Sequence, residues 1–176
     1  MTQGQEINYL SVKPDDLDSL AGPLSIDPSV LEKWKNMLAQ GQMDTIVAFK
    51  DKEPVGRCNV IWTGADEKEV TDELGIVPMV NALHVDEKSR GQGIGSSIMT
   101  ACEDLVKKHP DQPQILALGV EPDNTNARKL YEKLGYQYRK VNNQDTYKTS
   151  WPETRPEGEV IVSVECLLMV KNLDPS

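Results

Sequence analysis

The chain has 176 residues, and its 19 lysines and arginines against 28 aspartates and glutamates give a formal net charge of −9. This length can bury a hydrophobic core without a disulfide or metal framework, so we expect a single domain over residues 1–176. The negative charge argues against binding to nucleic acid or an anionic membrane and favours a cationic partner.

The N-terminal part of the chain predicts a strand and two helices. Residues 7–12 alternate weakly between polar and apolar side chains, as strands do. Two acids follow Pro14 and begin a short helix. Asp27 and Pro28 begin a longer one, because aspartate can cap the first turn and proline suits the first helical position. We expect this second helix to end at Gly41.

The next segment predicts an antiparallel hairpin and then an acidic run. Residues 45–49 and 55–62 are rich in β-branched and aromatic side chains, and a charged turn that ends in Pro54 separates them. Residues 64–73 read GADEKEVTDE, with five acids and one lysine. We expect either a solvated loop or an acidic rim that attracts an amine.

The stretch of residues 80–109 combines three local patterns. Residues 80–85 alternate, which predicts a strand. Apolar residues recur at helical spacing from Ile98 to Val106, which predicts an amphipathic helix. Between them, residues 90–95 include three glycines, which permit unusual backbone angles and expose successive N–H groups. The two predicted faces of the strand carry Asn81, Leu83 and Val85 on one side, and Val80, Ala82 and His84 on the other.

This glycine turn predicts an anion site. The first four amides of a helix have no partner inside it, and the helix dipole adds about half a positive charge there. Lys88 and Arg90 add full charges beside it. Nucleotide patterns do not fit, because no lysine follows Gly95 as in a P-loop, and GxGxxG read from Gly91 breaks at Ser96.

The same segment closely resembles the RxxGxG signature of the GNAT N-acetyltransferase superfamily. Arg90, Gly93 and Gly95 match its fixed positions, and Leu83 and Val85 form the LxV that precedes it. The resemblance implies an α/β fold of GNAT type, with a mixed, mostly antiparallel sheet flanked by helices. It also implies acetyl-CoA as cosubstrate, with its pyrophosphate in the turn. The residues expected to bind it here are Leu83, Val85, Arg90, Gly91, Gln92, Gly93, Ile94, Gly95 and Ser96.

A further strand and an amphipathic helix follow. Residues 115–120 form a short apolar run between prolines, which predicts the strand. Residues 123–136 read DNTNARKLYEKLGY. Asp123 or Asn124 can cap the predicted helix, and Gly135 ends it.

This second helix carries an independent match. Its pattern NxxAxxLYEKLGY resembles the last cofactor-binding helix of the same superfamily. In that family, the asparagine that matches Asn124 contacts the pantetheine arm, and the hydroxyl that matches Tyr131 lies near the thioester sulfur. Both residues also lie within about 20° of each other around the helix axis. We therefore expect Asn124 and Tyr131 to bind the cosubstrate.

The C-terminal part of the chain predicts the last strands of the sheet. Residues 136–141 and 160–170 are β-rich runs. Residues 147–151 either extend a hairpin or belong to a loop. The segment from Tyr138 to Glu159 is longer than a simple hairpin needs, and we expect it to shape the acceptor side.

The chemistry of acetyl transfer assigns a role to Tyr131 and leaves the base open. The departing thiolate needs a proton, and the resemblance implies that Tyr131 donates it; a backbone N–H near Val85 is expected to meet the oxyanion. In this family the early helical pair borders the acceptor pocket. Trp34 is therefore either a wall of that pocket or part of the core.

No residue stands out as the general base. Family members often carry a glutamate or histidine where this chain has Asn81, and members that act on protein N-termini often carry a glutamate where it has Gly119. Glu121, at the end of the strand, is the expected catalytic partner of Tyr131. His84 and a chain of water molecules are the alternatives.

These observations predict an acetyl-CoA-dependent N-acetyltransferase that acts on a primary amine by direct transfer in a ternary complex. We expect a small cationic acceptor and no nucleic acid or membrane partner. A protein lysine or N-terminus is the alternative acceptor, and a non-catalytic acyl-CoA-binding sensor is the alternative class. The sequence leaves formation of a homodimer open.

The cysteines and the N-terminal segment indicate a cytoplasmic protein without a metal. Cys58, Cys102 and Cys166 are far apart and show no CxxC spacing, so we expect reduced, buried thiols. Residues 1–10 lack the basic and apolar regions of a signal peptide, and no stretch approaches the roughly 20 apolar residues of a membrane span.

Overall fold

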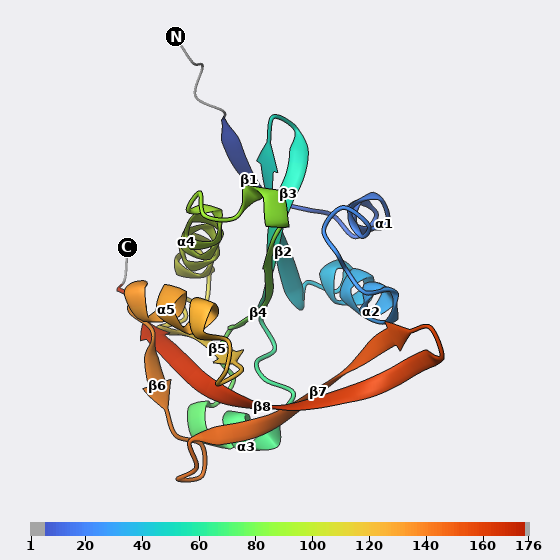
Figure 1. Ribbon diagram of the computed structural model, residues 1–176. Coiled ribbons are helices and arrows are strands. Elements are labelled where there is room, and N and C mark those ends of the chain that lie inside the picture. The colour runs from blue at the N-terminus through green and yellow to red at the C-terminus, as the bar shows by residue number, and fades with distance from the viewer. Residues whose placement is uncertain (1–5, 175–176) are drawn as a thin grey trace.

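The computed structural model describes residues 6–174, which form an eight-stranded sheet with helices on both faces (Figure 1). The strands are β1 (Ile7–Ser11), β2 (Met43–Lys50), β3 (Glu53–Ile61), β4 (Met79–Val85), β5 (Ile115–Val120), β6 (Gln137–Arg139), β7 (Thr146–Arg155) and β8 (Gly158–Asn172). The helices are α1 (Asp16–Leu20), α2 (Pro28–Ala39), α3 (Lys68–Leu74), α4 (Ile94–Lys107) and α5 (Thr125–Lys133), with a 3-10 turn η1 (Glu87–Ser89). The prediction that residues 1–10 contain no signal peptide rests partly on residues 1–5, which lie outside the described residues.

The sheet is antiparallel except at its centre. Its strand order is β1-β2-β3-β4-β5-β8-β6, and β7 pairs with β8 beside this path. β4 and β5 run parallel and pair through Met79 with Ala117 and through Val80 with Leu118. Ala82 has a φ of +57°, and the register with β3 shifts at the same place. β4 is therefore bulged just beyond its contact with β5. The parallel pairing of β4 and β5 among antiparallel neighbours confirms the predicted mixed, mostly antiparallel sheet flanked by helices.

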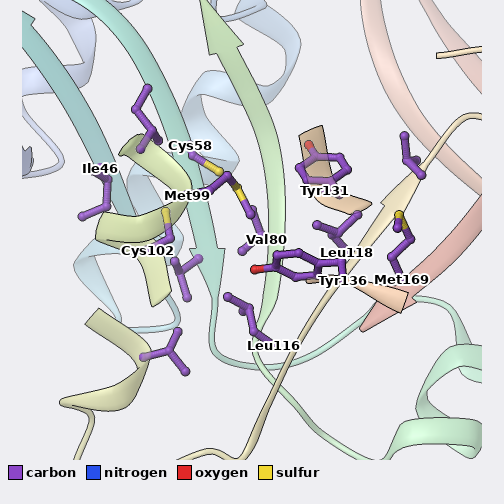
Figure 2. Close-up of a cluster of buried hydrophobic side chains, with 14 of the residues drawn as sticks. Ile46, Cys58, Val80, Met99, Cys102, Leu116, Leu118, Tyr131, Tyr136 and Met169 are labelled. Atoms are coloured by element: carbon purple, nitrogen blue, oxygen red, sulfur yellow. The ribbon is translucent and has the colours of Figure 1, made fainter. Parts of the chain in front are cut away.

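Three apolar clusters hold the layers together. The largest joins the sheet to α4 and α5, and Figure 2 shows Met99 and Cys102 of α4 on one side of this cluster and Tyr131 of α5 on the other. A second cluster packs α1 and α2 on the opposite face and contains Trp34, which is therefore part of the core. A third lies between α3, β7 and the centre of the sheet.

The bulge corrects the predicted alternation of β4. Val80 belongs to the α4 side of the core, and Leu83 and Val85 pack against that same cluster, whereas Ala82 packs with the α2 side. Val80 and Leu83 were expected on opposite faces. The extra residue at the bulge shifts the alternation by one, which brings them to the same face.

Two other segments differ from simple loops. Residues 64–73 were expected to be a solvated loop or rim, but α3 begins at Lys68, and its Val70 is 1% exposed. One apolar side chain per turn was enough to dock this acidic helix on the sheet. Residues 147–151 belong to β7, which pairs with β8 along its whole length and ends in a tight turn before Gly158.

Candidate active site

The glycine turn lies between β4 and α4, as predicted. Gly91 and Gly93 have φ values of +75° and +77°, and Gly93 is the residue just before α4. A Cβ atom at either position would meet no other atom within 4 Å. Glycine is therefore favoured here by the left-handed backbone conformation and not by close packing.

The start of α4 presents unpaired amides. Gly93 has no side chain to cap the helix, and the Ser97 N–H is the donor to the Gly93 carbonyl at 3.1 Å. The preceding amides of the first turn have no acceptor within the helix. Arg90 and Lys88 are exposed beside them, and Arg90 Nε donates to the Val85 carbonyl at 3.0 Å. This donor set suits a diphosphate such as that of acetyl-CoA.

The second predicted motif packs directly beside the first. A Cβ atom on Gly95 would lie 3.6 Å from Leu130 Cδ2 of α5 and 3.7 Å from Val85 Cγ2 of β4. Asn124 caps α5, because its Oδ1 accepts a hydrogen bond from the Ala127 N–H at 3.2 Å. The fold thus brings the glycine turn, the end of β4 and α5 together at one junction.

Tyr131 lies in the core at the inner side of α5. It is 7% exposed and packs edge-to-face on Tyr136, with ring centroids 5.9 Å apart (Figure 2). Burial, and to a lesser extent the neighbouring Cys58 and Cys102, raises the pKa of Tyr131 far above its usual value. The hydroxyl carries its proton at neutral pH, as an ordinary tyrosine does, and its burial makes it a weaker acid than a tyrosine in water.

Gly119 marks an exposed position near the C-terminal end of β5. It is exposed although its strand neighbours Leu118 and Val120 are buried. A Cβ atom on Gly119 would overlap the hydroxyl of Tyr147, which reaches over from β7. Tyr147 therefore takes the space that a side chain on β5 would otherwise fill.

The two candidate bases lie on neighbouring strands. His84 is half-buried and pairs with Arg57 across β3 and β4. Burial, followed by the charges of Arg57 and Arg90, lowers the pKa of His84, so the imidazole is uncharged at neutral pH. Glu121 is half-buried just after β5, and its carboxylate contributes, after burial, to raising the pKa of Cys166 to about 11.

The loop before α2 is tied to β7. Asp27 caps α2 through the Ser29 N–H at 2.9 Å and also accepts hydrogen bonds from the Thr154 N–H and hydroxyl. The Ser29 hydroxyl, together with the other donors, lowers the pKa of Asp27 to about 2. Ser29 Oγ also lies 2.9 Å from the Pro152 carbonyl oxygen of β7. The segment between Tyr138 and Glu159 thus lies against the early helical pair.

Sequence reasoning missed two side chains of this region. Tyr147 could not be found, because its relation to Gly119 exists only once β7 folds over β5. Arg57 left a visible signal, since it is a charged residue in the middle of an apolar strand.

In residues 6–174, no group of three or more His, Cys, Asp and Glu side chains is arranged to hold a metal ion. Within the same residues, no helix is long and apolar enough to cross a membrane.

Comparison with known proteins identifies the family. The model of the acetyltransferase (GNAT) family matches residues 11–136. Among curated protein sequences, none matches this chain.

Many solved structures share the fold. NAA60 from Arabidopsis thaliana in complex with a bisubstrate analogue has a TM-score of 0.67 at 18% identity, covering 97% of this chain and 100% of its own. The putative acetyltransferase yncA from Salmonella typhimurium, with acetyl-CoA, has a TM-score of 0.65 at 11% identity, covering 97% and 96%. The aminoglycoside acetyltransferase AAC(6')-Ib, in complex with coenzyme A, has a TM-score of 0.64 at 19% identity, covering 95% of each chain.

At these identities the neighbours establish the fold, and the family model covers most of the sequence. Both agree with the glycine turn and with the order of the elements around it. The chain therefore belongs to the GNAT family and is an acyltransferase with acetyl-CoA as its cosubstrate.

Proposed function

We propose that this protein transfers the acetyl group of acetyl-CoA to a primary amine of a small cationic molecule, with both substrates bound at once. The junction of Gly95, Val85 and Leu130 carries the proposal. Because the glycine turn and α5 meet there, one elongated cosubstrate can contact the turn with its diphosphate and α5 with its pantetheine arm.

The residues around this junction would divide the work. Amides of residues 94–96, with Arg90 nearby, would bind the diphosphate. Asn124 and Tyr131 would lie along the pantetheine arm. Tyr131 would protonate the departing thiolate, because a phenol carries a proton at neutral pH and can donate it at the end of the pantetheine arm.

Two groups are suited to take the proton of the attacking amine. Glu121 is the first, because it is a half-buried carboxylate that follows the exposed Gly119 on β5 by two residues. His84 is the second, because its lowered pKa leaves the imidazole free to accept a proton. Glu121→Gln and His84→Gln each remove one candidate. The variant whose rate no longer falls as the base is protonated at acidic pH identifies the base.

A cationic acceptor is supported by charge near β7. After burial, the carboxylates of Glu121 and Glu67 are the next largest causes of the raised Cys166 pKa, so both act on the same small region. Glu67 belongs to the acidic run of residues 64–73 and accepts a hydrogen bond from Thr149 of β7. This negative potential favours an ammonium group over an anionic substrate.

The contact between Tyr147 and Gly119 supports a small amine over a protein N-terminus. Family members that act on N-termini often carry a glutamate at the position of Gly119. Here a glutamate would fit only if the Tyr147 hydroxyl moved away from Gly119. A peptide acceptor would therefore need different chemistry at this strand.

The reaction is proposed to take place in the cytoplasm. Cys58, Cys102 and Cys166 are all unpaired and buried. Reduced thiols of this kind are typical of a reducing compartment.

Release of free CoA thiol tests the proposal directly. Acetyl-CoA is mixed with the protein and a panel of polyamines, aminoglycosides, and peptides with a lysine or a free N-terminus, and the acetylated product is identified by mass spectrometry. We expect release with small polyamines or aminoglycosides. Turnover with peptides alone would contradict the acceptor class, and saturable binding without release would identify a sensor.

A further inference from the structure

Arg57 is a buried arginine that binds only backbone carbonyls and an aromatic ring. It lies on β3 and is 7% exposed. Its Nε donates to the Leu24 carbonyl at 2.9 Å, its Nη2 to the Ser25 carbonyl at 3.1 Å, and its Nη1 to the Ala82 carbonyl. The guanidinium lies over the ring of Trp34, 5.3 Å from the centroid.

The charge of Arg57 is not neutralised by a carboxylate. In the described part of the chain, none of the salt bridges includes this side chain. Burial lowers the pKa of Arg57 to about 10, so the guanidinium is still charged at neutral pH. A buried charge is costly, and one that is kept without a counter-ion must make contacts that a neutral residue cannot make.

Two of its three acceptors belong to residues in an unusual backbone conformation. Ser25 has a φ of +53° and Ala82 a φ of +57°, and neither is a glycine. Such conformations persist only when the surroundings hold them. Ser25 lies in residues 21–27, the loop that leads into α2, which we call the loop segment. Ala82 lies at the β-bulge of β4, and we call residues 81–85 around it the bulge segment.

The planar fork of Arg57 thus reaches two segments from opposite sides of the candidate site. The loop segment leads to Asp27, which is tied to β7. The bulge segment ends at Val85, next to the glycine turn. Lysine has a single ammonium group and cannot hold both carbonyl sets in this fixed geometry.

We propose that Arg57 is a positioning residue that joins the loop segment to the bulge segment, so that the acceptor side and the thioester side of the site keep one relative geometry. This inference rests on the proposed acetyl transfer. Arg57 touches neither substrate in this role. It acts through the backbone of Ser25 and Ala82.

Arg57→Lys tests this role by hydrogen exchange, with Arg139→Lys as the matched control. Arg139 is an exposed arginine that pairs with Glu73 at 3.1 Å. In Arg57→Lys, exchange should rise in the loop and bulge segments together, while β5 and α5 stay protected. A uniform rise over the whole chain, a rise in one segment alone, or no change in either would overturn the proposal.

Kinetics of the same variants give the second readout. With the amine that reacts fastest in the wild type, kcat/KM should fall about 10-fold to 100-fold in Arg57→Lys, because small misplacements of reacting groups have effects of this size. The Kd of acetyl-CoA should change by a smaller factor than kcat/KM, since Arg57 makes no hydrogen bond to the glycine turn itself. Unchanged kcat/KM, or a loss confined to acetyl-CoA affinity, would contradict the proposal.

The wild-type protein provides a test that does not depend on the folding of a variant. In native-state exchange at low urea concentrations, amides of both segments should open with the same free energy and the same urea dependence. Different opening free energies would overturn the coupling. If no amine reacts with the wild type, the proposed function fails, whereas these exchange results still decide the role of Arg57.

Discussion

Tyr131 is the side chain proposed to protonate the departing thiolate. Its hydroxyl carries a proton at neutral pH, as an ordinary tyrosine does, and its ring packs against Tyr136. No side-chain hydrogen bond among the described residues involves this hydroxyl, so its removal leaves no broken partner in the core.

Tyr131→Phe should therefore fold normally and lose only the proton donor. We expect kcat to fall about 100-fold, the scale of a lost general acid, with the acetyl-CoA Kd unchanged. Steady-state kinetics and calorimetry measure the two quantities. An unchanged kcat would remove the acid role, and a large loss of affinity would show that the hydroxyl serves binding.

The charge of Arg57 should be visible at His84. Because the Arg57 charge helps to lower the pKa of His84, Arg57→Met should raise that pKa, whereas Arg57→Lys should leave it low. The imidazole would then become charged nearer to neutral pH. NMR titration measures this directly, because the chain has two histidines and His109→Gln removes the other signal. Equal values in all three proteins would contradict the electrostatic link.

At the level of single residues, the sequence predicted what depends on local rules. The positive-φ glycines of the turn and the capping Asn124 follow from backbone preferences and hydrogen bonding within a few positions. Arg57 and Tyr147 acquire their meaning from residues tens of positions away. Local patterns carry no information about those contacts.

Among the elements, α2 and β7 are joined by one carboxylate. Asp27 caps α2 and also holds Thr154, so Asp27→Ala should remove a helix cap and a contact between elements. We expect the free energy of unfolding to fall by about 1–2 kcal/mol at pH 7. Urea denaturation measures the change, and Asp104→Ala on the exposed side of α4 is the control. A fall in the free energy of unfolding of less than about a tenth of the expected value would contradict the link.

The same carboxylate predicts a pH dependence with a definite sign. The pKa of Asp27 is lowered to about 2 in the folded protein, so its contribution is present above the unfolded value of about 4. It should be lost as pH falls through the folded value. The stability difference between wild type and Asp27→Ala should therefore be constant from pH 7 to pH 5 and shrink toward pH 2. A difference that grows on acidification would contradict this account.

The errors at the scale of elements have one cause. The bulge at Ala82 reverses the alternation of β4, and α3 forms in an acidic run because the sheet offers Val70 a place to pack. Both depend on a neighbouring strand. Periodicity over six to ten residues cannot reveal either.

For the whole molecule, the sequence predicted the family from two short motifs and the structure explains why both are needed. Residues 90–95 and 123–136 are separated by one strand, and the parallel step from β4 to β5 places α4 and α5 on the same face. Gly95 then meets Leu130. What the motifs could not predict was the length of the β7–β8 hairpin, which extends the sheet beyond β5, and its attachment to α2 (Figure 1).

The acetyl-CoA site at the start of α4 is the central claim, and calorimetric titration of acetyl-CoA tests it most directly. Gly93→Val forces a bulky side chain into a left-handed backbone conformation in the turn. Gly41→Val imposes the same strain at φ +67° after α2, again with no atom within 4 Å of the added Cβ. We predict saturable binding by wild type and Gly41→Val and at least about 10-fold weaker binding by folded Gly93→Val. Equal affinity in all three proteins, or no binding heat in the wild type, would contradict the account.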